Sequence, residues 1–418
     1  MTDTVSPSST GTSTTYDVAR VRAHFPQLRE GQGLGAAHFD GPGGTQTPDV
    51  VARAVHDTLV GPLANDDSVT AAERNAARAV VDGRSAMADL LNADPRGIVF
   101  GRSMTQLTMD MARTLARDWG PGDEVVVTRL DHDSNVRSWI HAAERAGATV
   151  RWADFDPETG ELDVSEVAAV LSDRTRVVAV TAASNLIGTV PDVPAIAEVV
   201  HAAGALLYVD GVHYSAHALV DVEALGADFY ACSPYKFLGP HCGVLAGRPD
   251  VLEPLRPEKL APASDEIPAR FELGTPAYEL MAGVAAAVDF LAELVPAPGS
   301  RRDRLASSLA GLAGHEDRLR ERLEVAVAAL PGVTLYSRAA RRTPTLLATF
   351  DGRDLQDLRR HLASRNVNAP VGTFYAYEAS RRLGLEATGA LRMGLAPYTD
   401  DNDVERLVEG LTEYLAGA

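Results

Sequence analysis

Short apolar runs alternate with amphipathic, alanine-rich stretches through the middle of the chain. The apolar runs, rich in β-branched residues, are 124–128, 149–152, 177–181 and 205–210. The stretches with helical spacing are 138–146, 164–171 and 195–203. This alternation is typical of βαβ units on a mostly parallel sheet, and it predicts an α/β fold.

Polar residues follow several of the predicted strands. Asp210 ends one strand, Asp131–Asp133 follows a second and Ser184–Asn185 follows a third. Ligands of open α/β sheets bind in the crevice beyond the carboxyl ends of the strands. We therefore expect these side chains to converge on one crevice.

The length of 418 residues allows one large and one smaller domain. Residues 295–300, VPAPGS, have the composition of a linker. Later apolar runs at 334–336, 345–350 and 390–395 alternate with helical patterns, which indicates a small α+β domain. The predicted parts are a disordered leader over 1–15, an N-terminal segment over 16–38 packed on the small domain, a large domain over 39–294 and the small domain over 295–418.

Charge and composition narrow the functional class. The net charge of −18 argues against nucleic acid and anionic membranes as partners. Cys232 and Cys242 are too few for a disulfide framework and lack metal-site spacing, so no metal is expected. Residues 1–15 lack the apolar core of a signal peptide, and no run of 18 apolar residues occurs. These features predict a cytoplasmic protein.

Lys236 carries the most specific chemical signal. It lies in a Ser-x-x-Lys sequence that begins at Ser233 and follows an apolar run, and Asp210 lies 26 residues earlier. A lysine at the end of a strand can form an imine with an aldehyde cofactor and later move a proton at Cα. Asp210 would keep a pyridinium nitrogen protonated. A single lysine is more often a solvated surface residue, so this interpretation depends on the surrounding pattern.

Two further features fit pyridoxal 5′-phosphate (PLP). The sequence Gly101–Gln106 falls between an apolar run and an amphipathic helix, and a helix N-terminus binds phosphate well. Arg392 follows a short apolar run and can bind a substrate carboxylate in bidentate fashion. Ser103 and Asp210 could each be helix caps, but all of these features in this order favour a cofactor site.

The chain resembles class V aminotransferases of the cysteine-desulfurase type, within the fold-type I PLP enzymes. The resemblance covers about 39–411, nearly the whole chain. The motifs that carry it are Phe39–Gly44, Ser103–Thr105, Asp131–Asn135, Ala183–Thr189, Val209–His213, Ser233–Lys236, Phe271–Pro276 and Arg392–Tyr398.

The resemblance implies a large domain with a mainly parallel seven-stranded sheet flanked by helices, and a homodimer with active sites at the interface. It places Ser103, Met104 and Ser233 on the cofactor phosphate, and Thr275 on the phosphate of the neighbouring subunit. Asn185 and His213 would lie near the cofactor O3′. Around the substrate it implies, together with Arg392, the residues Gly43, Tyr375 and Tyr377.

The sequence departs from the desulfurase pattern at three places. Residues 368–377 contain no cysteine where desulfurases carry the loop nucleophile, and sulfur transfer requires a thiolate. The resemblance places Asp133 at the position that stacks on the ring in relatives, with His132 just before it. Asp133 could serve there as an acid–base group, or His132 could supply the stacking ring after a one-residue shift. Asn368 stands where related sequences often have a second arginine.

Three reactions remain open to a PLP enzyme without a loop cysteine: β-elimination, transamination or epimerisation, and decarboxylation with oxygen-dependent deamination. The favoured interpretation is a C–S lyase, or a decarboxylating deaminase, that acts on an S-substituted cysteine in secondary metabolism such as antibiotic biosynthesis. The alternatives are an amino-acid epimerase or aminotransferase, and a non-catalytic regulatory or binding protein of the same fold.

Overall fold

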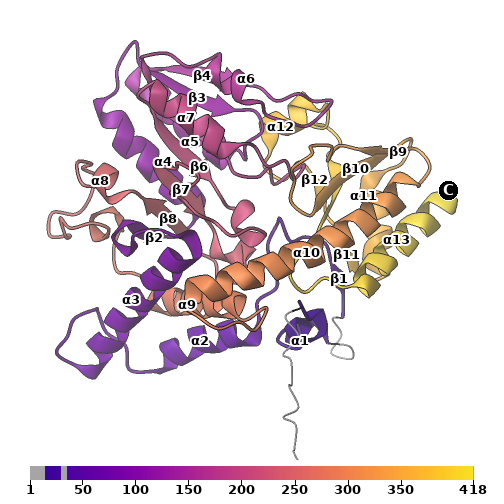
Figure 1. Ribbon diagram of the computed structural model, residues 1–418, viewed down its shortest axis with the longest axis horizontal. Helices are drawn as coiled ribbons and strands as arrows, with labels where there is room; N and C mark the ends of the chain where they lie inside the picture. The colour runs from indigo at the N-terminus through magenta and orange to yellow at the C-terminus, as the bar shows by residue number, and fades with distance from the viewer. Residues whose placement is uncertain (1–14, 30–34, 418) are drawn as a thin grey trace, which may run out of the picture.

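A seven-stranded sheet forms the centre of the large domain in the computed structural model (Figure 1). Its strands, in spatial order, are β2 (Ile98–Gly101), β8 (Gly243–Gly247), β7 (Phe229–Cys232), β6 (Leu206–Asp210), β5 (Thr175–Thr181), β3 (Glu124–Thr128) and β4 (Thr149–Ala153). Strands β3 to β7 pair in parallel, whereas β8 runs antiparallel to both β7 and β2. The predicted, mainly parallel seven-stranded sheet is confirmed.

Helices bury both faces of this sheet. Val125 and Val127 of β3 pack in a core with α4 (Met104–Leu115) and α5 (Ser134–Ala146). Val126 between them packs on the other face, in a core with α3 (Ala71–Leu91), α7 (Val193–Ala202) and α9 (Tyr278–Ala292). Successive strand residues point to opposite faces, so a strand covered on both sides needs a continuous apolar run. This is why the apolar runs located the strands.

The small domain is built on an antiparallel sheet. Its strands, in spatial order, are β12 (Val371–Gly372), β13 (Ala390–Gly394), β10 (Thr345–Phe350) and β9 (Val333–Leu335). A separate pair joins β1 (Ala37–His38) to β11 (Val367–Asn368) in parallel. The other helices are α1 (Val18–Arg22), α2 (Asp49–Val60), α6 (Val164–Ala168), α8 (Pro249–Leu252), α11 (Leu355–Ser364), α12 (Tyr377–Arg382) and α13 (Asp401–Ala416). The 3₁₀ helices are η1 (Pro26–Leu28), η2 (Pro95–Gly97), η3 (Ala116–Asp118), η4 (Tyr214–Ala216), η5 (Pro234–Lys236) and η6 (Ala269–Phe271).

The long helix α10 (Arg301–Ala328) joins the two domains (Figure 1). Ser300 caps it in a capping box with Asp303, so residues 295–300 form the loop before the helix. Leu305, Leu309 and Leu312 belong to the core of the large domain, whereas the later Leu319, Leu323 and Val327 belong to that of the small domain. The change from one core to the other therefore occurs within α10 and not at the proline-rich loop.

The N-terminal segment contacts both domains. Val21 and Phe25 belong to the large-domain core. Arg20 donates to the carbonyl oxygens of Glu293 and Leu294, at 2.8 and 2.5 Å. Arg22 forms ion pairs with Asp400 and Asp403 of the small domain, at 3.1 and 2.6 Å. The segment thus ties the two domains together.

The structure describes residues 15–29 and 35–417. The predicted leader lies outside them except for its last residue. Within those two ranges, no helix combines the length and the apolar composition that a membrane span requires. The same residues contain no group of three or more histidine, cysteine, aspartate or glutamate side chains placed to hold a metal ion.

Candidate active site

The carboxyl ends of four neighbouring strands bring the candidate residues to one edge of the sheet. Asp210 ends β6, and Ser233 follows β7 directly before the turn that carries Lys236. Asn185 lies beyond β5, and His132 lies between β3 and α5. Because parallel strands end at the same edge, residues far apart in the sequence share one site.

Lys236 is buried at this edge, with 9% of its surface exposed. Its ammonium nitrogen Nζ donates a hydrogen bond to the carbonyl oxygen of Pro42 at 2.5 Å. Burial, and then the charge of Arg392, lower the pKa of Lys236 to about 7, against the opposing carboxylates of Asp40 and Asp210. The neutral amine is the nucleophile that attacks an aldehyde, so this environment prepares Lys236 for imine formation.

Asp210 is a buried carboxyl with 3% of its surface exposed. It accepts one hydrogen bond from the backbone N–H of Val212 at 2.9 Å. Burial raises the pKa of Asp210 to about 6, against the effects of that hydrogen bond and of the Lys236 charge. A positive charge placed beside it would lower this pKa again. A protonated pyridine nitrogen is such a charge, so Asp210 fits the predicted partner of the ring.

The N-terminus of α4 provides a place for a phosphate. The Ser103 hydroxyl caps the helix by accepting from the backbone N–H of Gln106 at 3.1 Å. Gly243 of β8 packs against the Ser103–Met104 peptide, where an added Cβ would lie 2.2 Å from the Ser103 carbonyl carbon. Ser233 is buried beyond the neighbouring strand β7. A helix N-terminus approached closely by backbone on one side is well suited to an anion. Sequence reasoning did not single out Gly243.

Two buried polar atoms in this region have no hydrogen-bond partner: Asn185 Oδ1 and His213 Nδ1. The other ring nitrogen of His213 contacts the hydroxyls of Thr343 and Thr345, at 2.8 and 3.1 Å. Burial, then the charges of His217 and of the site cations, lower the pKa of His213, so the ring is neutral. Buried polar atoms are normally paired. These two atoms fit a ligand with hydrogen-bonding groups, such as the hydroxyl of PLP, and the residues present fit this cofactor.

Arg392 of β13 brings the small domain into the site. It is 2% exposed, and it forms an ion pair with Asp40 at 2.9 Å between Nη2 and Oδ1. Its Nη1 donates to the backbone carbonyl oxygen of Asn185, also at 2.9 Å. Burial lowers the pKa of Arg392 to about 10, against the effect of Asp40. Sequence reasoning missed Asp40, although it lies within the motif Phe39–Gly44.

His132 and Asp133 have different surroundings. Burial, and then the charges of Lys236 and Arg392, lower the pKa of His132 to about 4, which places a neutral imidazole among the site cations. The Asp133 carboxylate instead pairs with Arg137 one turn later in α5, at 3.1 Å. Burial raises the pKa of Asp133, and the charges that affect it come from Arg137, Glu378 and His141. The structure therefore groups His132, and not Asp133, with Lys236.

Residues 373–377 end the segment 368–377, which the resemblance aligns with the desulfurase loop. Phe374 and Tyr375 have positive φ angles of 54° and 57°, which residues other than glycine rarely adopt. The Tyr375 carbonyl accepts from the Asp133 backbone N–H at 2.7 Å, and the Tyr375 ring lies 5.7 Å from that of His132. The guanidinium carbons of Arg137 and Arg381 lie 5.5 and 5.6 Å from the centroid of the Tyr377 ring. Both tyrosines are exposed.

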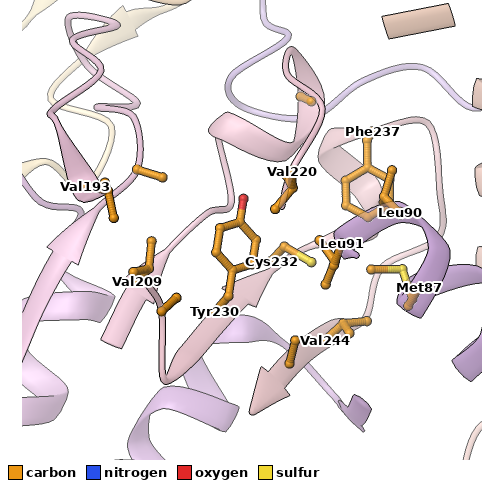
Figure 2. Close-up of a cluster of buried hydrophobic side chains, with 14 of the residues drawn as sticks. Met87, Leu90, Leu91, Val193, Val209, Val220, Tyr230, Cys232, Phe237 and Val244 are labelled. Carbon is orange, nitrogen blue, oxygen red and sulfur yellow. The ribbon is translucent and has the colours of Figure 1, made fainter. Parts of the chain in front are cut away.

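The two cysteines of the chain lie elsewhere. Figure 2 shows Cys232 within an apolar cluster that includes Met87, Leu91 and Val244. Burial raises the pKa of the Cys232 thiol above its ordinary value and that of Cys242 to about 12. Burial thus disfavours at both positions the thiolate that sulfur transfer requires.

Thr275 lines another cavity and Gly43 lies beside Asp40, so their predicted roles stay predictions. Thr275 is exposed and lines a separate cavity of about 1150 Å³, together with Arg117, Lys259 and Tyr278. The described lining of that cavity does not include Lys236. An added Cβ on Gly43 would lie 2.3 Å from Asp40 Oδ1, so Gly43 makes room for Asp40.

Comparison with known proteins agrees with this geometry. The aminotransferase class V profile matches residues 37–407. The chain is 35% identical to an uncharacterised protein of Mycobacterium tuberculosis, over 95% of this chain and 98% of that protein. It is 33% identical to a probable cysteine desulfurase of Pseudomonas aeruginosa, over 94% and 97%. The crystal structure of the cysteine desulfurase CsdA from Escherichia coli superposes with a TM-score of 0.84 at 26% identity, over 96% of this chain and 99% of that one. The chain belongs to the class V aminotransferase family of PLP-dependent enzymes.

Proposed function

We propose that this class V aminotransferase-family enzyme is a C–S lyase that acts on an S-substituted cysteine, in secondary metabolism such as antibiotic biosynthesis. The observation that carries the proposal is the combination of a desulfurase-like site with no accessible thiol in the described residues. Cys232 and Cys242 are both buried, and segment 373–377 provides aromatic rings in place of the nucleophile. The bound sulfur substituent then leaves as a thiol and is not passed to a protein cysteine.

The cofactor supplies the electron sink that stabilises a carbanion at Cα of the substrate. Lys236 holds the cofactor and afterwards moves the Cα proton, for which a pKa of about 7 suits neutral pH. Asp210 keeps the ring nitrogen protonated. Ser103, Met104 and Ser233 hold the phosphate, while Asn185 and His213 hydrogen-bond the O3′ side.

The substrate residues have distinct roles in this proposal. Arg392 would bind the substrate carboxylate, and His132 would contact the cofactor ring. Tyr375 and Tyr377 are exposed, and in this proposal they give an extended substituent on sulfur an aromatic surface to contact. Asp133 supports the start of α5 through Arg137.

The location of Thr275 supports a dimer. Thr275 faces the cavity of about 1150 Å³ and is separate from the Lys236 group of its own chain. We therefore place Thr275 at the phosphate of a second subunit, in a homodimer whose sites lie at the interface. The cytoplasm, with its reducing conditions, suits a protein with two free thiols.

The experiment is to mix the purified yellow enzyme with S-alkyl and S-glycosyl cysteines and to identify the products by mass spectrometry, with and without oxygen. A free thiol with pyruvate and ammonia is the expected result. An aldehyde with loss of CO2 would replace the lyase by the decarboxylating deaminase, and amino-group exchange or inversion at Cα would mean an aminotransferase or epimerase.

Two variants make the outcome specific. Lys236→Ala should lose both the colour and the products; colourless wild-type protein without products would mean a non-catalytic binding protein. The double variant Cys232→Ala/Cys242→Ala should keep thiol release, because neither thiol takes part. If a folded double variant that still binds the cofactor no longer released sulfur, a desulfurase mechanism would be supported in place of the lyase.

A further inference from the structure

The arginine that the proposed function assigns to the substrate carboxylate already has an acidic partner. Asp40 Oδ1 lies 2.9 Å from Arg392 Nη2. The Asp40 side chain is 36% exposed, whereas that of Arg392 is only 2% exposed. The carboxylate of Asp40 therefore lies on the solvent side of the pair.

The three guanidinium nitrogens of Arg392 differ in their hydrogen bonding. Nη1 donates to the Asn185 carbonyl, and Nη2 binds Asp40. The buried Nε has no hydrogen-bond partner. Arginine binds carboxylates best through two parallel N–H groups. A carboxylate that bridged Nε and Nη2 would satisfy the unpaired nitrogen, and it would have to replace Asp40 at Nη2.

Phe374 restricts the approach to this edge. Its ring covers one face of the guanidinium group, with 3.7 Å between Arg392 Cζ and the ring centroid. The Phe374 carbonyl accepts a hydrogen bond from the Asn185 side-chain amide at 2.9 Å, which fixes the backbone that carries the ring. With that face covered and Nη1 engaged, the edge that Asp40 occupies is the one left to an incoming carboxylate.

The position of Asp40 is defined by its own loop. The backbone N–H of Gly43 donates to the Asp40 carbonyl at 2.9 Å, which folds the loop back. A Cβ at Gly43 would lie 2.3 Å from Asp40 Oδ1 and 2.6 Å from its carboxyl carbon. The missing side chain of Gly43 therefore creates the space in which the Asp40 carboxylate reaches Arg392.

We propose that Asp40 occupies the substrate-carboxylate position on Arg392 in the free enzyme and is displaced when an amino acid binds. This inference rests on the proposed function in taking an α-amino acid as the ligand. Asp40 keeps the buried arginine paired and oriented before substrate arrives. Each amino acid then binds in competition with it, whereas an amine without a carboxylate leaves the Asp40–Arg392 pair intact. Asp40 is thus a specificity-determining residue that weakens the binding of carboxylates.

The test compares alanine with ethylamine, which has the same side chain without the carboxylate. Each is titrated into the holoenzyme, and the dissociation constant is read from the first change in the visible absorption of the cofactor. Asp40→Asn keeps the size of the side chain and removes its charge. We expect the dissociation constant for alanine to fall about tenfold, equivalent to ~1.4 kcal/mol, and that for ethylamine to change less than twofold.

Gly43→Ala is the second variant, because it leaves both charged residues in place and pushes the Asp40 carboxylate away sterically. Gly43→Ala should lower the dissociation constant for alanine, as Asp40→Asn does. Asp154→Asn is the matched control: Asp154 has the same side-chain exposure of 36% and pairs with Arg129 and Arg382, away from Arg392. It should change neither constant.

Weaker binding of alanine by Asp40→Asn would overturn the proposal and make Asp40 a support for Arg392. Equal changes for alanine and ethylamine, or no spectral response of the wild type to either ligand, would also overturn it. Thermal melting and cofactor content show whether Asp40→Asn is folded. If it is not, the result for Gly43→Ala decides whether the proposal stands. The lyase proposal fails separately, through its products: a different reaction with the expected alanine shift would leave the role of Asp40 standing.

Discussion

The side-chain amide of Asn185 donates a 2.9 Å hydrogen bond to the backbone carbonyl of Phe374. Asn185 follows β5 of the large domain, while Phe374 follows β12 of the small domain. This bond, together with the one from the Asp133 backbone N–H to Tyr375, holds the segment over the site. Segment 373–377 is therefore tied to the large domain through two of its backbone carbonyls.

Removal of this bond should loosen the segment. We expect Asn185→Ala to speed hydrogen exchange of the amides in 373–377 about fivefold, since one net hydrogen bond contributes ~1 kcal/mol. The measurement is hydrogen exchange followed by mass spectrometry. Asn75→Ala is the control. The side-chain amide of Asn75, in α3, donates to the Pro62 carbonyl at the same distance of 2.9 Å. Unchanged exchange in Asn185→Ala would show that the bond does not hold the segment.

The lowered pKa of Lys236 gives cofactor attachment a defined pH dependence. Only the neutral amine attacks an aldehyde, and the pKa of about 7 means that the neutral form increases as pH rises through 7. The rate at which cofactor-free protein binds PLP should rise with a midpoint near pH 7, as followed by visible absorption in stopped flow.

Arg392 tests the cause of this pKa. Its charge lowers the pKa of Lys236, so Arg392→Gln should move the midpoint of cofactor attachment to higher pH. A midpoint near 10 in the wild type would show that Lys236 is solvated. A midpoint that Arg392→Gln leaves in place would mean that the two cations do not interact.

His132 and Asp133 should differ in their effect on turnover. His132→Asn removes a ring beside Lys236 and Arg392, and we expect kcat/KM for thiol release to fall about 100-fold. Asp133→Asn breaks an ion pair with Arg137 on one helix and should cost much less. The measurement is the steady-state kcat/KM of each variant, together with its affinity for the cofactor. A larger loss in Asp133→Asn would return the acid–base role to that residue.

The sequence predicted the sheet and the Lys236–Asp210 pattern because both depend on local features: continuous apolar runs, and polar residues directly after them. It could not place the pair Asp40–Arg392, whose members lie 352 positions apart and meet only through domain packing. Phe374 and Tyr375 adopt positive φ without glycine or asparagine, so their sequence gave no sign of that backbone. The sequence likewise did not show that α10 enters both cores, because the spacing of apolar residues along a helix does not specify what they pack against.

Asp131 links the site to the pH dependence of stability. It is fully buried and accepts hydrogen bonds from the Thr128 hydroxyl and, at 2.7 Å, from the Asn135 amide. Burial raises the pKa of Asp131 to about 8, above its value near 3.9 in an unfolded chain. Between these values the folded protein binds the extra proton, so this group's contribution to stability is full below about pH 4 and is lost as pH rises through 8.

Asp131→Asn removes the titratable carboxyl group while keeping the shape of the side chain. From pH 5 to 8, the free energy of unfolding of cofactor-free protein should fall less steeply in Asp131→Asn than in the wild type, by at most ~1.4 kcal/mol per pH unit. Urea titrations at each pH measure this slope. Glu144→Gln, an exposed change in α5, should keep the wild-type slope. Parallel slopes for wild type and Asp131→Asn would mean that Asp131 is ionised in the folded protein, and its hydrogen bonds would then stabilise a carboxylate beside the site.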